Sequence, residues 1–66
     1  MEIIVNGESM SIDKPVTVGQ LIALRNEGSG GIAVARNGKL VRRQDWDHTQ
    51  VDNGDDIVII KAAYGG

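Results

Sequence analysis

The sequence has no cysteine and only two aromatic residues, Trp46 and Tyr64. Without cysteine the chain has no disulfide framework, no thiolate metal site and no thiol nucleophile, which is compatible with a reducing cytosol. A long apolar run is also missing near the N-terminus, because Glu2 is acidic and Asn6 breaks the segment. Signal peptides and membrane spans need such a run. We therefore expect a cytoplasmic protein with no membrane partner.

Basic charge is scarce as well. Seven Lys and Arg against nine Asp and Glu give a formal net charge of −2. A nucleic-acid-binding surface usually combines a basic stripe with aromatic rings for stacking, and the sequence offers neither. We expect no nucleic acid partner.

The length of 66 residues allows one small domain. A domain of this size buries only about 60% of the surface that its unfolded chain exposes, so it has one modest core. We expect a folded domain over residues 1–61 and a flexible C-terminal tail over residues 62–66 that ends in Gly-Gly.

Two Asn-Gly pairs predict two β-hairpins, because Asn-Gly favours the tight turn between antiparallel strands. In the first, "EIIVN" places Ile3 and Val5 on one face of a strand, the turn lies at Asn6-Gly7, and a return strand is expected near Ser9 to Asp13. In the second, the turn at Asn37-Gly38 joins strands predicted over Ile32 to Arg36 and Lys39 to Val41.

A helix is predicted from about Val18 to Asn26. Thr17 is the expected N-cap, and Gln20 three residues later completes a capping box. Val16 and Leu21 hold the positions of a hydrophobic staple. We expect Gly28 to end the helix in a left-handed turn, and "EGSGG" over residues 27–31 to be a loop. The predicted apolar stripe of the helix contains Val18, Leu21, Ile22 and Leu24.

The last predicted strand contains four consecutive branched aliphatic residues, Ile57 to Ile60. Such a run suits a strand that is covered on both faces or lies centrally in a sheet. Because one amphipathic helix covers one face of one sheet, the chain predicts a ββαββ sheet packed on a single helix. We expect the last strand to lie in the middle, beside the first.

Residues with catalytic or metal-binding chemistry are few. His48 is the only histidine and lies in a polar segment, which favours a solvated loop residue. The acidic residues Asp52, Asp55 and Asp56 surround Asn53-Gly54, so a turn explains them better than a cation site does. The "GSGG" run at residues 28–31 follows a helix, whereas phosphate loops precede one. We predict no catalytic residue and no metal site.

Lys39, Arg42 and Arg43 form the one local positive group. Charges on a hairpin edge discourage aggregation, and a docking patch for an acidic partner is the alternative interpretation. Trp46 is expected to anchor the core, because so small a core needs its large residues.

The two C-terminal glycines follow the predicted central strand through a short stalk of small residues. A terminal carboxylate has a pKa near 3.5, so at neutral pH it is an anion that resists attack at carbon. ATP can activate it as an acyl adenylate, which a sulfur or nitrogen nucleophile then attacks. Gly65 and Gly66 have no Cβ and fit a narrow channel that leads to such a site.

The whole chain resembles the ThiS-type sulfur carriers of thiamine biosynthesis, which have the β-grasp, ubiquitin-like fold. The resemblance is carried by "VNGE", "TVGQLI", "GIAVARNGKLV", "RQDWDHTQVDNGDDIVII" and the terminal Gly-Gly. It departs from the family at Arg42, where proline is frequent, and in the "AAY" stalk. The fold implied is α+β, with a mixed sheet of four to five strands packed on one helix.

The resemblance also implies a cycle of reactions at Gly66. A ThiF-type adenylating enzyme would use ATP and magnesium to activate Gly66, and sulfur from a cysteine desulfurase or another donor would convert it to a thiocarboxylate. A ThiG-type thiazole synthase would receive the sulfur. The chain itself would be a protein co-substrate and not an enzyme, would bind no cofactor, and would be a monomer when free. The residues implied to enter the partners' active sites are Gly65, Tyr64, Ala63 and Ala62.

Other functions share this tail. The small subunit of molybdopterin synthase and carriers for cysteine or another sulfur metabolite use the same chemistry with a different docking surface. A ubiquitin-like modifier would join Gly66 to a lysine through an isopeptide bond. A noncatalytic β-grasp interaction module would not use the glycines at all.

Overall fold

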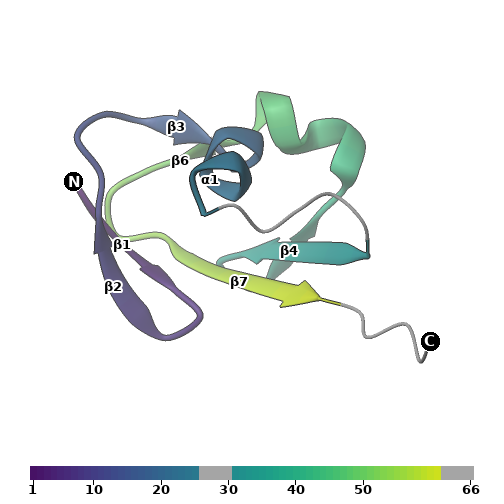
Figure 1. Cartoon of the computed structure of the whole chain (residues 1–66), viewed down its shortest axis with the longest axis horizontal. Helices are drawn as coiled ribbons and strands as arrows, with labels where there is room; N and C mark the ends of the chain where they lie inside the picture. Colours follow the sequence, from purple (N-terminus) through teal and green to yellow (C-terminus); the bar gives the residue numbers. More distant parts are fainter. Residues whose placement is uncertain (26–30, 62–66) are drawn as a thin grey trace.

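The sheet is built around the last strand of the chain. In the computed structural model, which describes residues 1–25 and 31–61, five strands lie in the order β2-β1-β7-β4-β5 (Figure 1). β7 pairs in parallel with β1 and antiparallel with β4, which confirms the predicted mixed sheet with the last strand beside the first. The strands are β1 (Glu2–Val5), β2 (Glu8–Ser11), β4 (Ile32–Arg36), β5 (Lys39–Val41) and β7 (Asp56–Lys61).

Both Asn-Gly pairs form the predicted hairpin turns. Asn6 and Asn37 each have a φ of 52°, and Gly7 and Gly38 have φ of 83° and 85°. Two successive positive φ angles define the turn whose twist matches that of paired strands. The second hairpin has the predicted bounds. The first return strand is Glu8–Ser11 and not Ser9 to Asp13, because a two-residue turn places Glu8 directly opposite Val5.

The predicted capping box opens the helix α1 (Val18–Leu24), which follows the short strand β3 (Val16–Thr17). The Thr17 hydroxyl accepts from the Gln20 backbone N–H at 3.1 Å, and the Gln20 side chain accepts from the Thr17 N–H at 2.9 Å. These two bonds satisfy N–H groups that have no partner within the helix. The helix ends at Leu24 with Arg25 as its C-cap, two residues before the predicted end at Asn26.

Asn26 and Gly28 lie outside the described residues, so the left-handed turn expected at Gly28 stays a prediction. Leu24 does not belong to the buried stripe, since it is 64% exposed. Leu24 follows the buried Ile22 by two positions, and two positions correspond to a rotation of about 200° around the helix axis. The Leu24 side chain therefore points away from the side of the helix on which Ile22 lies.

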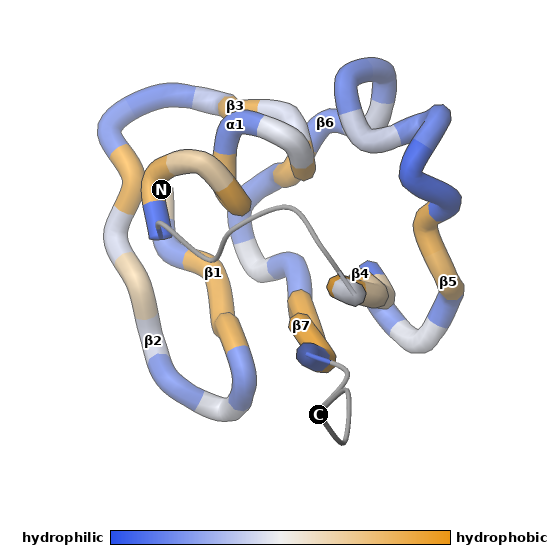
Figure 2. The backbone as a smooth tube through the Cα atoms, turned by 45° about the vertical axis from the view of Figure 1, so that its right-hand side comes forward, coloured by the Kyte–Doolittle hydropathy of each residue, from blue (hydrophilic) through white to orange (hydrophobic). Residues whose placement is uncertain are grey.

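One core lies between α1 and the inner face of the sheet, as Figure 1 shows. Figure 2 shows the hydrophobic segments of β1 and β7 that contribute to it. Its fully buried residues come from β1, α1, β4, β7 and the short strand β6 (Gln50–Val51), which pairs with β3. They are Ile3, Val5, Val18, Leu21, Val34, Val51 and Ile57.

Trp46 is the predicted core anchor, and it is buried. It belongs to η1 (Arg43–His48), a 3-10 helix that the sequence did not predict. Its indole Nε1–H donates to the Val41 carbonyl at 3.0 Å, so the polar edge of the ring has a partner. The ring thus joins the end of β5 to the core.

β7 is central but covered on one face only. Ile57 and Ile59 are buried, whereas Val58 and Ile60 are 39% and 59% exposed. The expectation of a central strand is confirmed, and the alternative of a strand covered on both faces is wrong. The physical reason is that α1 packs on a single face of the sheet. Within residues 1–25 and 31–61, neither helix has the length and apolar composition to cross a membrane.

The two isoleucines of β7 provide a matched test of this arrangement. We expect Ile57→Ala to lower the free energy of unfolding by about 2–5 kcal/mol, because it opens a cavity in the core. Ile60→Ala removes the same atoms from an exposed site and should cost less than about 1 kcal/mol. Urea unfolding of both variants measures the difference, and equal losses would contradict the one-sided burial of β7.

Candidate functional site

The candidate site begins where β7 ends. The antiparallel pairing of β4 with β7 continues to Lys61, which lies opposite Ile32, so the last described residue before the tail is still part of the sheet. On the other side of β7, the Asn6 side chain accepts from the Ile59 N–H at 2.8 Å. β7 is therefore held on both sides as far as Ile59, and its pairing with β4 continues to Lys61.

All the predicted site residues lie outside the described part of the chain. They are Ala62, Ala63, Tyr64, Gly65 and Gly66. Their roles stay a prediction, as does the division into a domain and a tail. What the structure describes is the surface beside the end of β7.

That surface is apolar on the side of the sheet opposite α1. Two sets of paired residues cross the strands on this side. In the first, Ala35 of β4 lies between Leu40 of β5 and Val58 of β7. In the second, Ala33 of β4 lies opposite Ile60 of β7. Because side chains alternate along strands, these residues share one face, which we call the outer face. Ile4, Leu40, Val58 and Ile60 are its large exposed hydrophobic residues. Contiguous exposed apolar side chains are typical of a surface that binds another protein.

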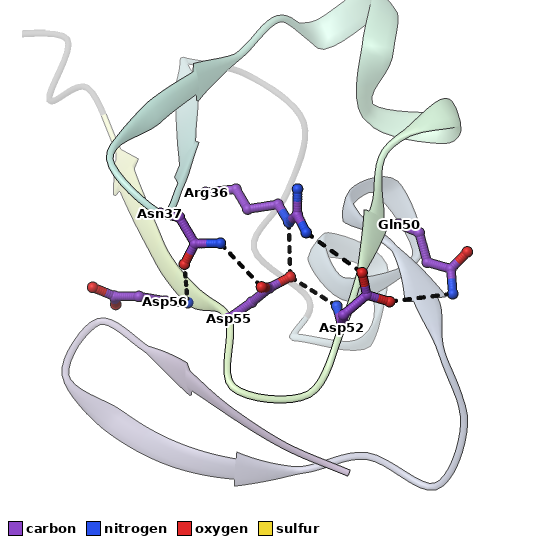
Figure 3. Close-up of polar contacts among 6 residues, drawn as sticks. All are labelled: Arg36, Asn37, Gln50, Asp52, Asp55 and Asp56. Carbon is purple, nitrogen blue, oxygen red and sulfur yellow. Dashed lines mark hydrogen bonds and ion pairs between the residues drawn. The ribbon is translucent and has the colours of Figure 1, made fainter.

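The acidic residues before β7 form a structural network (Figure 3). The Asp55 carboxylate accepts from Arg36 Nε at 2.7 Å, from the Asn37 side chain at 3.0 Å and from the Asp52 backbone N–H at 2.8 Å. Asn37 Oδ1 in turn accepts from the Asp56 N–H at 2.9 Å. The network joins the turn after β4 to the start of β7, and this supports the interpretation of the acidic residues as a turn.

The charge of Asp55 is stabilised although its side chain is buried. Burial by itself acts to raise the pKa of Asp55, but the hydrogen bonds from Asp52, Arg36 and Asn37, together with the Arg36 charge, outweigh it. The net result is a pKa of Asp55 below its ordinary value. The same hydrogen bond, from Arg36 to Asp55, raises the pKa of Arg36 above its ordinary value. Both groups are therefore charged at neutral pH.

The other residues with functional chemistry do not come together. His48 is exposed in the last turn of η1. Across the described ranges, no three His, Cys, Asp or Glu side chains gather in a way that would hold a metal ion. Of the "GSGG" run only Gly31 is described, and it has a positive φ of 66°.

The comparisons with known proteins agree with one another. The ThiS family model matches residues 3–66. The sulfur carrier protein ThiS of Escherichia coli (strain K12) is 30% identical over 66 residues, which cover the whole of both chains.

Solved structures of thiamine biosynthesis protein ThiS from Geobacter metallireducens have the same fold. The crystal structure has a TM-score of 0.85 and 29% identity and covers all of both chains. The NMR structure has a TM-score of 0.80 and 26% identity, with 100% of this chain and 88% of that chain covered.

The chain belongs to the ThiS family. The expected α+β, β-grasp fold is confirmed by the structural match to a ThiS protein. Membership places the chain among the small sulfur carrier proteins of thiamine biosynthesis, which are carriers and not enzymes.

Within this ThiS-family fold, sequence reasoning missed two features of the candidate site. The first is Arg36 as the partner of Asp55, 19 residues away, for which the sequence contains no local signal. The second is the outer face. Its signal was present in the uninterrupted aliphatic run of β7, which puts apolar side chains on both faces of the strand, and in Leu40, which is apolar between the charged residues Lys39 and Arg42.

The buried charge of Asp55 predicts a loss of stability in acid. A pKa lower in the folded than in the unfolded state means that the stabilisation is complete above the ordinary pKa of about 4 and is lost as the pH falls through the folded value. At neutral pH, Asp55→Asn should lower the free energy of unfolding by about 1–3 kcal/mol, since Arg36 loses its acceptor charge.

Urea unfolding at neutral pH and in acid measures this effect. The difference between the unmodified protein and Asp55→Asn should shrink in acid. Asp56→Asn, at the neighbouring exposed carboxylate, is the matched control and should change little. A constant difference between the unmodified protein and Asp55→Asn at every pH would contradict the role given to the Asp55 charge.

Proposed function

We propose that this chain is the sulfur carrier whose Gly66 carboxylate is adenylated with ATP by a ThiF-type enzyme and converted to a thiocarboxylate, which donates sulfur to a thiazole synthase. The observation that carries the proposal is the match to the ThiS family over residues 3–66, which includes both terminal glycines. The end-to-end similarity to the curated sulfur carrier ThiS supports it.

The chemistry starts from the low reactivity of a carboxylate. The Gly66 carboxylate attacks the α-phosphate of ATP, pyrophosphate leaves, and the resulting acyl adenylate carries a good leaving group. A sulfur nucleophile attacks the acyl carbon, a C–S bond replaces the C–O bond, and AMP leaves. With hydrosulfide the product is the thiocarboxylate. With a persulfide, as from a cysteine desulfurase, a thiol reductant must then cleave the S–S bond.

The described residues supply the rest of what a carrier needs. The chain brings no cofactor to this chemistry, because the ATP and magnesium belong to the activating enzyme. Lys61 is still paired with Ile32 of β4, so the tail would start from a residue that belongs to the sheet. Five extended residues reach roughly 16 Å, which is enough to enter a partner's active site. The outer face beside β7 is the surface on which both partner enzymes would bind in turn, and the chain would be a monomer between these encounters.

Mass spectrometry of the C-terminal tryptic peptide tests this function. Trypsin releases "AAYGG" after Lys61. After incubation with ATP, the cognate ThiF-type enzyme and a sulfur source, we expect this peptide to show the mass of one sulfur in place of one oxygen. Oxidation of methionine gives nearly the same mass change, but this peptide contains no methionine.

Deletion of Gly66 is the control and should abolish the change in mass. An unmodified peptide, obtained with an enzyme that activates another carrier in the same assay, would overturn the proposal. A peptide joined to a lysine through an isopeptide bond would identify a modifier instead.

The narrow channel expected around the two glycines gives a second test. Gly65→Val should lower the rate of ATP–pyrophosphate exchange by about a hundredfold, because a Cβ and two methyl groups displace the reacting carboxylate. Gly65→Ala should have a smaller effect. The thermal unfolding midpoint of each variant reports on the fold independently, and a normal exchange rate for Gly65→Val would contradict the channel.

A further inference from the structure

The positive charge of the chain is concentrated at one edge of the sheet. No Asp or Glu occurs between Glu27 and Asp45, although the chain as a whole is acidic. Within that stretch lies β5, the edge strand next to β4. We use the name basic edge for Lys39, Leu40 and Arg42, all of which are exposed.

Leu40 and Arg42 point to the same side. Arg42 follows β5 with an extended backbone, φ −65° and ψ 145°, so the alternation of side chains continues from Leu40 to Arg42. Leu40 is 71% exposed on the outer face, opposite Ala35. In the described part of the chain, the side chains of Lys39 and Arg42 have no ion pair or hydrogen bond, so their charges are available to a partner.

Contacts with Trp46 fix the backbone at the C-terminal end of the basic edge. The Arg43 guanidinium lies 5.0 Å from the centre of the Trp46 ring, and that ring donates to the Val41 carbonyl. Val41 packs against the core. These contacts hold the residues on both sides of Arg42, which reduces the ordering that a partner must impose on the backbone.

Protection against aggregation explains the charges of the basic edge but not its exposed leucine. Charges on an edge strand prevent other strands from pairing with it. An exposed leucine on the same side as the Arg42 charge does the opposite, because it offers an apolar contact at the same place. A central apolar side chain with charges at its rim is the typical composition of a protein-binding surface.

We propose that the basic edge docks onto an acidic patch, with an apolar recess for Leu40, on the adenylating enzyme that receives the tail. This inference rests on the proposed function. β5 and β7 are two strand spacings apart, or about 10 Å, so one partner surface can cover the basic edge and the origin of the tail together. Leu40 contributes affinity, while Arg42 and Lys39 guide the encounter and its orientation.

The test measures binding to the purified cognate ThiF-type enzyme, with ATP–pyrophosphate exchange measured in parallel. Arg42→Glu should lower the association rate constant by about tenfold at low salt, with Arg42→Gln intermediate, and added salt should reduce the difference. Lys14→Glu makes the same change in net charge in the segment between β2 and β3 and should change the rate less than twofold. Leu40→Ala should weaken binding about tenfold with little salt dependence.

The outcomes separate the inference from the function on which it rests. If the unmodified chain is adenylated but Arg42→Glu and Lys14→Glu bind equally well, the basic edge is not a docking surface and only this inference fails. Normal binding by Leu40→Ala removes the apolar part of the proposal. If the unmodified chain is not adenylated by an active enzyme, the proposed function fails and the inference fails with it. Thermal unfolding of each variant shows that its fold is retained.

Discussion

The position of β7 in the middle of the sheet is the constraint on which the rest of the structure depends. Its pairing with β1 and β4 brings together the first and last described strands of the chain. Its buried residues Ile57 and Ile59 face the core, and the Arg36–Asp55 pair and its hydrogen bonds join its start to the turn after β4. The predicted tail over residues 62–66 would follow a strand that is held on both sides through most of its length, which suits the proposed presentation of one reactive group.

A single helix leaves one face of this sheet uncovered. α1 packs on the inner face, so the outward side chains of β7 and β5 stay exposed as the outer face. A small domain pays a free-energy cost for such exposure, because apolar area is left in water. Under the proposed function, in which two partner enzymes bind in turn, the same area is available at each encounter. The fold would then combine a stable base with a reusable binding surface.

Local signals predicted much of the fold because their physics involves only neighbouring residues. Asn-Gly turns and the Thr17–Gln20 capping box form within four residues, and both are present as predicted. The wrong or missing parts have non-local causes. Leu24 belongs to the predicted apolar stripe of the helix, but its position around the helix axis points it outward. β3 and β6 escaped prediction because two-residue strands form only when tertiary contacts bring them together. The 3-10 helix η1 escaped it as well, and it packs against α1 and β3.

The sequence by itself determined the turns, the start of the helix and the alternation of β1, because each depends on backbone preferences or on hydrogen bonds between near neighbours. Only the tertiary structure decided which carboxylate is buried and paired, and which aliphatic side chains remain exposed. Asp55 meets Arg36 through the packing of β4 beside β7, and Val58 and Ile60 are exposed since α1 covers the opposite face. Burial and pairing over such distances depend on how strands and helix assemble, and no short stretch of sequence contains that information.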